Sequence, residues 1–339
     1  MTKPNSTNFS HCKQMKHLQK VNVQSLNLIQ LFVCVGFLAL IIVGCSAPQR
    51  VTVYNYHNTF EPFNGIKIDD NFFCDQTEIT NINYQEYLFW TKQIFGPNST
   101  EFKSTLPDTT LWPIADSCYH TLNNFYFWHS DYNNYPVVGV SQNQAKQYSK
   151  WRSDRVFEYY LVNNNFIPYS IAPTAENYFT IEKYFNEALP NVVKDHRVKY
   201  YPNFRLPNLA ERQTILAYAD ITYNAFLEKC KSKKCKECLT ENPLIRSNID
   251  PCAKARNWDD NISDESTRSV WYECMPYKRL GIYDIKGNVA EWALETNTAY
   301  GGSWNDDKEQ ILKVDTQTYV SPNPYTGFRN VFEWKKWEE

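Results

Sequence analysis

Scarcity of glycine is the most constraining feature of this sequence, because only ten of its 339 residues are glycine. Glycine supplies positive φ angles and close backbone contacts, so a chain that rarely uses it keeps each one for such a position. The scarcity excludes collagen-like, linker-rich and propeller-like sequences. Six of the ten glycines fall in four short segments, and we expect these to form the skeleton of the fold. The segments are Pro136–Val140, Gly281–Trp292, Gly301–Trp304 and Gly327–Arg329.

The composition is that of a folded protein with a large core. Hydrophobic residues make up 42% of the chain and charged residues 21%, which is too little charge for a disordered chain. The formal net charge is −2. Of the 35 Lys and Arg, four precede position 45, where no Asp or Glu occurs, so the remaining 31 face 37 acidic residues and the net charge there is about −6. We therefore expect no nucleic-acid partner.

The N-terminal region has the pattern of an export signal. A polar, lysine-containing stretch leads into an apolar run over residues 26–44, as in secretory signal peptides. The run ends in Ile42-Val-Gly-Cys45, which resembles the bacterial lipoprotein box, where the cysteine receives lipid and becomes the mature N-terminus. We expect a signal peptide over 1–44, lipidation at Cys45 and a tether over 45–62. An uncleaved membrane helix is the alternative, since the run is barely long enough to span a bilayer.

From Phe63 onward there is no linker, low-complexity tract or repeat, so residues 63–334 are expected to form one domain. Two stretches of it, about 160–200 and 226–275, are interpreted as insertions. Apolar spacing and capping residues predict helices over 81–94, from Ser141 and after Pro207. Pro136–Val140 is predicted to be a buried strand-like run, and short strands and turns are expected after residue 280.

Six short segments in this order resemble the formylglycine-generating enzyme (sulfatase-modifying factor) family. They are Asp75–Thr80, Pro136–Val140, Phe204–Pro207, Gly287–Trp292, Gly301–Trp304 and Gly327–Arg329. The resemblance implies an α+β domain with a C-type-lectin-like core and little regular secondary structure. The segment 124–129 and the lipoprotein signal further resemble the subgroup of gliding-motility and type IX secretion lipoproteins.

Enzymes of this family oxidise a substrate cysteine with two active-site cysteines that lie between the last two segments and bind copper, and thiolates suit Cu(I). In this sequence the interval from Gly302 to Gly327 contains no cysteine. The absence of these two cysteines favours a non-catalytic domain. No catalytic residue is assigned, and no copper is expected. Glu78 and Glu211 are expected to anchor loops by buried hydrogen bonds, and Arg329 to pair with a core carboxylate.

The resemblance also implies a structural Ca²⁺ site. Its ligands would be the Asp284 side chain, the carbonyls of Gly287 and Val289, and the Glu291 carboxylate. Ca²⁺ takes six to eight oxygen ligands, and a turn containing glycine lets main-chain carbonyls converge beside two carboxylates. An ordinary acidic turn before a core tryptophan is the alternative.

Seven cysteines remain after the two in the leader and the lipidated one are removed from the total of ten. In an oxidising compartment they allow up to three disulfides and one thiol left over. A lysine-rich stretch contains four of them, and there disulfides are favoured over a zinc site or a redox pair. These disulfide candidates are Cys230, Cys235, Cys238 and Cys252.

Taken together, the sequence predicts an exported lipoprotein, anchored by lipid in the outer membrane and facing the periplasm. Its expected role is a structural or binding subunit that contacts other subunits of a gliding or type IX secretion assembly. One alternative is an oxidase of the formylglycine-generating type with an altered active site. Another is a glycan-binding, lectin-like protein. The candidate contacts for a partner or glycan are the aromatic residues Tyr54, Tyr56, Tyr119, Tyr126 and Trp128.

Overall fold

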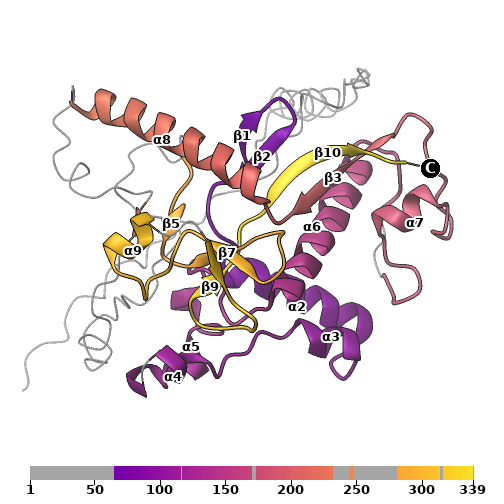
Figure 1. Cartoon of the computed structure of the whole chain (residues 1–339). Helices are drawn as coiled ribbons and strands as arrows, with labels where there is room; N and C mark the ends of the chain where they lie inside the picture. Colours follow the sequence, from indigo (N-terminus) through magenta and orange to yellow (C-terminus); the bar gives the residue numbers. More distant parts are fainter. Residues whose placement is uncertain are drawn as a thin grey trace, which may run out of the picture. The chain divides into compact units, whose positions relative to one another are not determined.

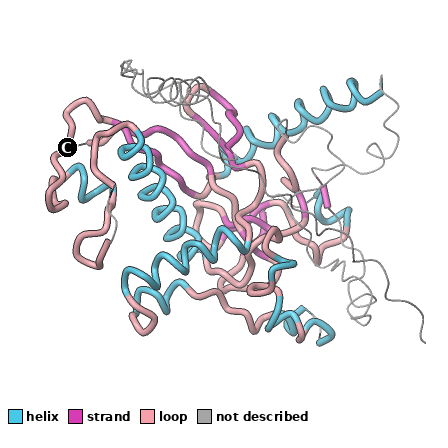
Figure 2. The backbone as a smooth tube through the Cα atoms, turned by 180° about the vertical axis from the view of Figure 1, so that it is seen from behind, coloured by secondary structure: helices cyan, strands magenta, loops and turns pink. Residues whose placement is uncertain are grey.

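The computed structural model describes residues 65–115, 117–169, 173–231, 245–246, 281–313 and 316–338. All of them belong to the unit Asn55–Glu339 and combine helices with short strands (Figures 1 and 2). The α+β class expected from the sequence is therefore confirmed. The expected leader over 1–44 and tether over 45–62 lie outside the described residues, as does most of the stretch 226–275.

A four-stranded antiparallel sheet joins the two ends of the described chain. The strand order is β1-β2-β10-β3, so the last strand lies between two early ones. The bounds are β1 Gly65–Asp69, β2 Phe72–Asp75, β3 Tyr200–Arg205 and β10 Val331–Lys336. In Figure 1, β10 (yellow) runs beside β3 over most of its length.

Alternation along these strands sends successive side chains to opposite faces of the sheet. Phe73 and Phe332 pack on the face covered by helix α6 (Gln142–Asn163). Cys74 and Val331, their neighbours in the chain, pack on the other face with residues of helix α8 (Leu209–Lys231). The sheet is thus covered on both faces.

A second sheet, of order β8-β7-β6-β9, is built from strands of two or three residues. The bounds are β6 Ala290–Trp292, β7 Thr298–Tyr300, β8 Thr316–Thr318 and β9 Thr326–Gly327. Strands β6 and β9 are parallel neighbours, which places two of the glycine-containing segments side by side. A further short pair joins β4 (Ile245–Arg246) to β5 (Lys286–Gly287).

The two long helices in the first half of the domain begin at capping boxes. Helix α2 (Asn81–Phe95) is capped by Thr80, whose hydroxyl accepts from the N–H of Asn83. Helix α6 is capped by Ser141 in the same way, with the Gln144 side chain accepting from the Ser141 N–H at 2.8 Å. Both caps satisfy N–H groups that a helix leaves without partners. These two predicted helices are confirmed, and α8 confirms the third.

The remaining helices are short. They are α3 (Thr100–Thr105), α4 (Trp112–Ala115), η1 (Ser117–Tyr119), α5 (Leu122–Phe125), η2 (Ser130–Tyr132), α7 (Ile181–Phe185) and α9 (Lys308–Lys313).

The segment Pro136–Val140 is buried, as expected, but it is not a strand. Its backbone bonds are divided among separate segments: the Val137 N–H donates to Ile79 and the Gly139 N–H to Asn323. Gly139 has a φ of +73°, which turns the chain out of an extended course. A strand needs one partner running alongside it, so this segment links several loops instead.

Residues from the stretch 160–200 pack with the C-terminal half of α6 in a hydrophobic cluster of their own. The buried members are Phe157, Leu161, Ile167, Phe179, Ile181, Tyr184, Phe185, Leu189 and Val198. A larger cluster joins α2, α6 and β6, and within it the rings of Tyr84 and Tyr148 stack at 5.6 Å. The space between α2, α6 and α7 lies next to both clusters.

Candidate functional site

Three of the four glycine-containing segments meet at a buried cluster of charged side chains; they are Gly281–Trp292, Gly301–Trp304 and Gly327–Arg329. Arg329 is fully buried, and its guanidinium donates to Glu291 Oε1 from Nε and Nη2 at 2.9 and 2.8 Å. Its other N–H groups donate to the carbonyls of Asp75 and Tyr283. One side chain therefore connects the end of β2, the loop before β5 and strand β6. The expected pairing of Arg329 with a core carboxylate is confirmed.

A second guanidinium faces the same carboxylate. Arg212 of α8 is 3% exposed and places Nη1 3.7 Å from Glu291 Oε2, while Nη2 donates to the Ile285 carbonyl. Gly301, at φ +92°, makes this possible, because a Cβ there would lie 2.9 Å from Arg212 Nη2. Glu291 is thus held between two arginines.

Glu78 completes the cluster from the segment after β2. Its Oε1 accepts from Asn288 Nδ2 at 3.0 Å, and the residue is 1% exposed. Burial, with the nearby Asp284 carboxylate, raises the pKa of Glu78 well above its usual range. Its other oxygen, Oε2, lies 3.8 Å from Arg329 Nη2. The arrangement holds loops together, and the expected anchoring role of Glu78 is confirmed.

Glu211 anchors the start of α8. Its carboxylate accepts from the Arg205 guanidinium at 2.6 and 2.7 Å and from the Asn208 N–H at 2.9 Å. The residue is only partly buried. The anchoring role is as expected, with more solvent contact than the sequence suggested.

The residues expected to bind Ca²⁺ lie in and beside this charged cluster. Asp284 and Val289 are 1% exposed and Glu291 is 2% exposed, and Asp284 has a φ of +49° within the turn. Glu291 Oε1, however, is already bound by Arg329. One of the two side-chain ligands therefore has a cationic partner, and calcium binding stays a prediction. Among the described residues there is no group of three or more His, Cys, Asp or Glu arranged to hold a metal ion.

The interval between Gly302 and Gly327 is organised by Asp306. Its Oδ2 accepts from the N–H of Ser303 at 2.7 Å and from the Ser303 hydroxyl at 2.9 Å. The same oxygen accepts from Gln317 Nε2 at 3.2 Å. The Asp306 carboxylate thus folds this loop and places Trp304 in the core, where its ring is 3% exposed.

Most cysteine predictions fall outside the described residues. Cys45, Cys235, Cys238 and Cys252 belong to that part, and Cys230 lies in α8 without a described side chain. Cys74 of β2 is a free, fully buried thiol. Burial raises the pKa of Cys74 to about 12, so the thiol stays protonated and unreactive.

Of the aromatic contact candidates, Tyr54 and Tyr56 lie outside the described residues, and the other three separate into two groups. Trp128 is 55% exposed, whereas Tyr119 and Tyr126 are 3% and 1% exposed and belong to the core. For these two tyrosines the expected exposure is wrong, because they pack against Trp112 and neighbouring rings.

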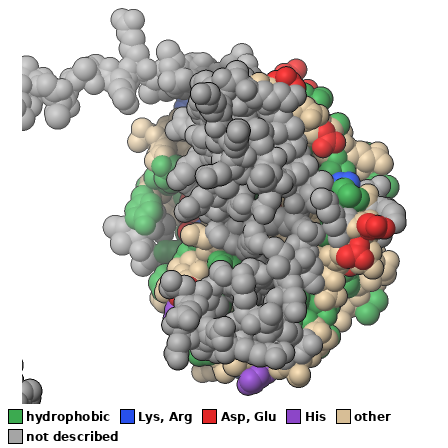
Figure 3. Space-filling model, turned by 90° about the vertical axis from the view of Figure 1, so that its left-hand side faces the viewer, with side chains coloured by type: hydrophobic (Ala, Val, Ile, Leu, Met, Phe, Trp, Pro, Cys, Tyr) green, Lys and Arg blue, Asp and Glu red, His purple; other side chains and the backbone are tan. Residues whose placement is uncertain are grey.

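Figure 3 shows described hydrophobic and acidic side chains along the edges of one face of the molecule. No described helix is long and apolar enough to cross a membrane.

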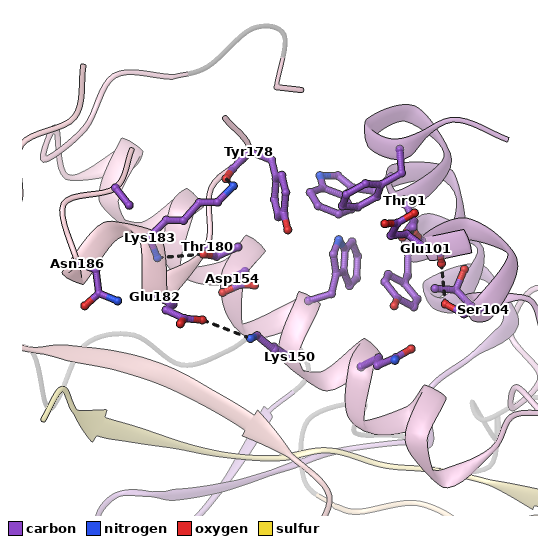
Figure 4. A pocket seen from close by; sticks show the side chains of 17 residues that line it. Thr91, Glu101, Ser104, Lys150, Asp154, Tyr178, Thr180, Glu182, Lys183 and Asn186 are labelled. Carbon is purple, nitrogen blue, oxygen red and sulfur yellow. Dashed lines mark hydrogen bonds and ion pairs between the residues drawn. The ribbon is translucent and has the colours of Figure 1, made fainter. Parts of the chain in front are cut away.

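A cavity of about 570 Å³ opens between α2, α3, α6 and the chain around α7 (Figure 4). Its aromatic lining is Tyr87, Trp90, Phe95, Trp151 and Tyr178, and its polar lining includes Glu101, Lys150, Asp154, Glu182 and Lys183. No pattern in the sequence predicted this cavity. Trp90 and Trp151 were visible on two predicted helices, but Tyr178 and Lys183 come from the stretch interpreted as an insertion.

Comparison with known proteins agrees with this architecture. The model of the sulfatase-modifying factor enzyme 1-like domain matches residues 41–334, most of the chain. The chain belongs to this family. No curated protein sequence matches the chain.

The similar solved structures include the following two. The crystal structure of CarF is 16% identical, with 77% of this chain and 86% of that one covered and a TM-score of 0.36. The Treponema denticola variable protein 1 is 17% identical, with 77% and 84% covered and a TM-score of 0.32.

Proposed function

We propose that this protein is a non-catalytic, exported lipoprotein, anchored through Cys45 in the outer membrane and facing the periplasm. In this proposal its sulfatase-modifying factor domain keeps a C-type-lectin-like core and serves as a structural or binding subunit of a gliding or type IX secretion assembly. The absence of cysteine between Gly302 and Gly327 is the main observation that supports a non-catalytic role. There the Asp306 carboxylate folds the loop by hydrogen bonds to Ser303 and Gln317.

The buried charges support the same proposal. A catalytic carboxyl needs access to a substrate, and both Glu78 and Glu291 are almost fully buried and hydrogen-bonded to side chains of the fold. Paired charges in such a cluster stabilise one arrangement of loops. A subunit that presents loops to partners needs them held in this way.

Crosslinking followed by affinity purification of the full-length protein from native membranes tests the assembly role. We expect other membrane or periplasmic subunits to be recovered with it, and Cys45→Ala to leave the membrane fraction. Recovery of monomer alone would contradict the assembly role. Cys45→Ala protein that stays in the membrane would contradict the lipid anchor.

Oxygen consumption with a cysteine-containing peptide, together with copper analysis, tests the oxidase alternative. We expect neither bound copper nor peptide-dependent oxygen uptake, because two thiolates are missing where Cu(I) would be held. Copper-dependent uptake would overturn the non-catalytic proposal.

A secondary proposal is that the domain binds Ca²⁺ through Asp284, Gly287, Val289 and Glu291. It requires Glu291 to share its carboxylate between Ca²⁺ and arginine. Added Ca²⁺ should then raise the melting temperature of chelator-treated protein, and Asp284→Asn should remove that gain. An unchanged melting temperature would mean that the two guanidinium groups alone neutralise the cluster.

A further inference from the structure

The cavity between α2, α6 and α7 has one aromatic wall. Trp90 and Phe95 project from α2, Trp151 from α6, and Tyr178 from the chain before α7. Ring centroids lie 5.6 Å apart for Trp90 and Tyr178, and 5.4 Å apart for Phe95 and Tyr178. All four rings are partly exposed, unlike the aromatic core beside them. A concave, partly hydrated aromatic surface is the usual wall of a small-molecule site.

The opposite side of the cavity is polar. Asp154 is 6% exposed and lies deep in the site, with Oδ1 accepting from the Ile181 N–H at 2.8 Å. Lys150 and Glu182 form an exposed ion pair at 3.9 Å nearer the solvent (Figure 4). Glu101 approaches from α3 on the other side of the rings. Donors and acceptors therefore surround the space that the rings enclose.

The charges of the lining identify the kind of ligand that fits. Aromatic cages for quaternary ammonium groups offer open ring faces to the cation. Here the protein's own cations are over two of the rings: Lys183 Nζ is 3.8 Å from the Tyr178 centroid, and Arg155 Cζ is 4.6 Å from the Trp90 centroid. A cationic ligand would meet these groups, and an anionic one would meet Glu101 and the other lining carboxylates. A neutral ligand avoids both penalties.

We propose that this cavity binds a neutral pyranose ring of a glycan. Arg155 and Lys183 each cover one face of a ring, so the apolar C–H face of the sugar would pack against the remaining aromatic surface. Its hydroxyl groups would reach the polar side. Site volumes of about 300–1,000 Å³ are typical for ligands of this size. A second cavity of about 570 Å³ shares Lys150, Asp154, Glu182 and Asn186 with the first. The two cavities therefore adjoin, and the proposal extends to a short oligosaccharide as the ligand.

Titration of the purified full-length protein tests the site. The detergent must be non-glycosidic, so that its headgroup does not compete. The probes are maltotriose, cellotriose, mannotriose and chitotriose, followed by calorimetry and tryptophan fluorescence. At least one should bind with a dissociation constant of about 1 mM or lower, and more tightly than its monosaccharide. Absence of binding by all four would overturn the proposal.

Variants locate the binding. Trp90→Ala should weaken it at least about tenfold, and Tyr178→Ala provides a second test if the first variant folds poorly. Phe89→Ala is the matched control, because Phe89 is the neighbouring residue on α2, is 65% exposed and does not line the cavity. Binding that survives both ring deletions in folded protein would place the sugar elsewhere and overturn the proposal.

Charged probes complete the test. Choline, glucosamine and glucuronic acid should bind more weakly than the best neutral sugar. Tighter binding of choline would instead assign a cation cage, and tighter binding of either charged sugar would assign a charge-selective site. Both results would contradict a neutral ligand. This titration uses isolated protein, so its failure is distinguishable from failure of the assembly role, which is measured in native membranes.

Discussion

At the scale of single residues, the buried side chain of Arg329 makes a testable contribution to folding. Its guanidinium has four hydrogen bonds to Glu291, Asp75 and Tyr283, and none of it is exposed. Arg329→Met should therefore lower the free energy of unfolding by about 3–5 kcal/mol, because it leaves the Glu291 carboxylate buried without its closest cation. Urea denaturation followed by circular dichroism measures this.

The double variant Arg329→Met with Glu291→Gln is the control for that interpretation. Removing both charges should cost less than the sum of the single changes, because neither partner is left charged and buried. Additive losses would show that Arg329 acts mainly through its two backbone carbonyl contacts. Those contacts are 2.9 and 2.7 Å long.

At the scale of elements, Gly139 sets the course of the segment Pro136–Val140. A Cβ at this position would lie 2.3 Å from the Asp108 carbonyl oxygen, and φ is +73°. Gly96, at the end of α2, also has a positive φ of +89°, but a Cβ there would have nothing within 4 Å. Gly139→Ala should therefore be more destabilising than Gly96→Ala by about 1–3 kcal/mol, the usual cost of overpacking.

Thermal unfolding of the two alanine variants measures the difference. Both variants carry the strain of a positive φ, and Gly96→Ala is the control in which the new Cβ contacts nothing. Equal melting temperatures would mean that the loop around Asp108 moves aside at little cost. The N–H of Asp108 donates to the Gly139 carbonyl at 2.8 Å, which argues against easy movement.

At the scale of the whole molecule, local signals in the sequence were sufficient for some features and not for others. Thr80 and Ser141 specify helix starts through neighbours three residues away, so both helices were predictable. The pairing of Arg329 with a core carboxylate was expected, although Glu291 as the partner, 38 residues away, came only from the structure. The cavity brings Trp90 and Tyr178 together. Hydrophobic periodicity and helix-capping patterns are local, so they do not predict contact between residues so far apart in the sequence.

Stability should also depend on pH through the buried carboxyl groups. Burial raises the pKa of Asp154 to about 6, from an ordinary value near 4. Between these values the folded protein keeps a proton that the unfolded chain has lost, so this contribution is complete below about pH 4 and is lost as pH rises toward 6. Glu78, with its raised pKa, acts in the same direction.

The raised pKa values of Asp154 and Glu78 should therefore make the full-length protein melt at a higher temperature at pH 5 than at pH 7.5. Asp154→Asn should raise the melting temperature at pH 7.5 and reduce the difference between the two pH values, because the neutral amide keeps an oxygen acceptor for the Ile181 N–H. The pair of Asp195 and Arg197 opposes this trend only below about pH 4, because the lowered pKa of Asp195, about 2, gives a contribution that is lost as pH falls from 4 toward 2. A pH dependence unchanged in Asp154→Asn would mean that water reaches this carboxyl through the cavity and removes the desolvation that raises its pKa.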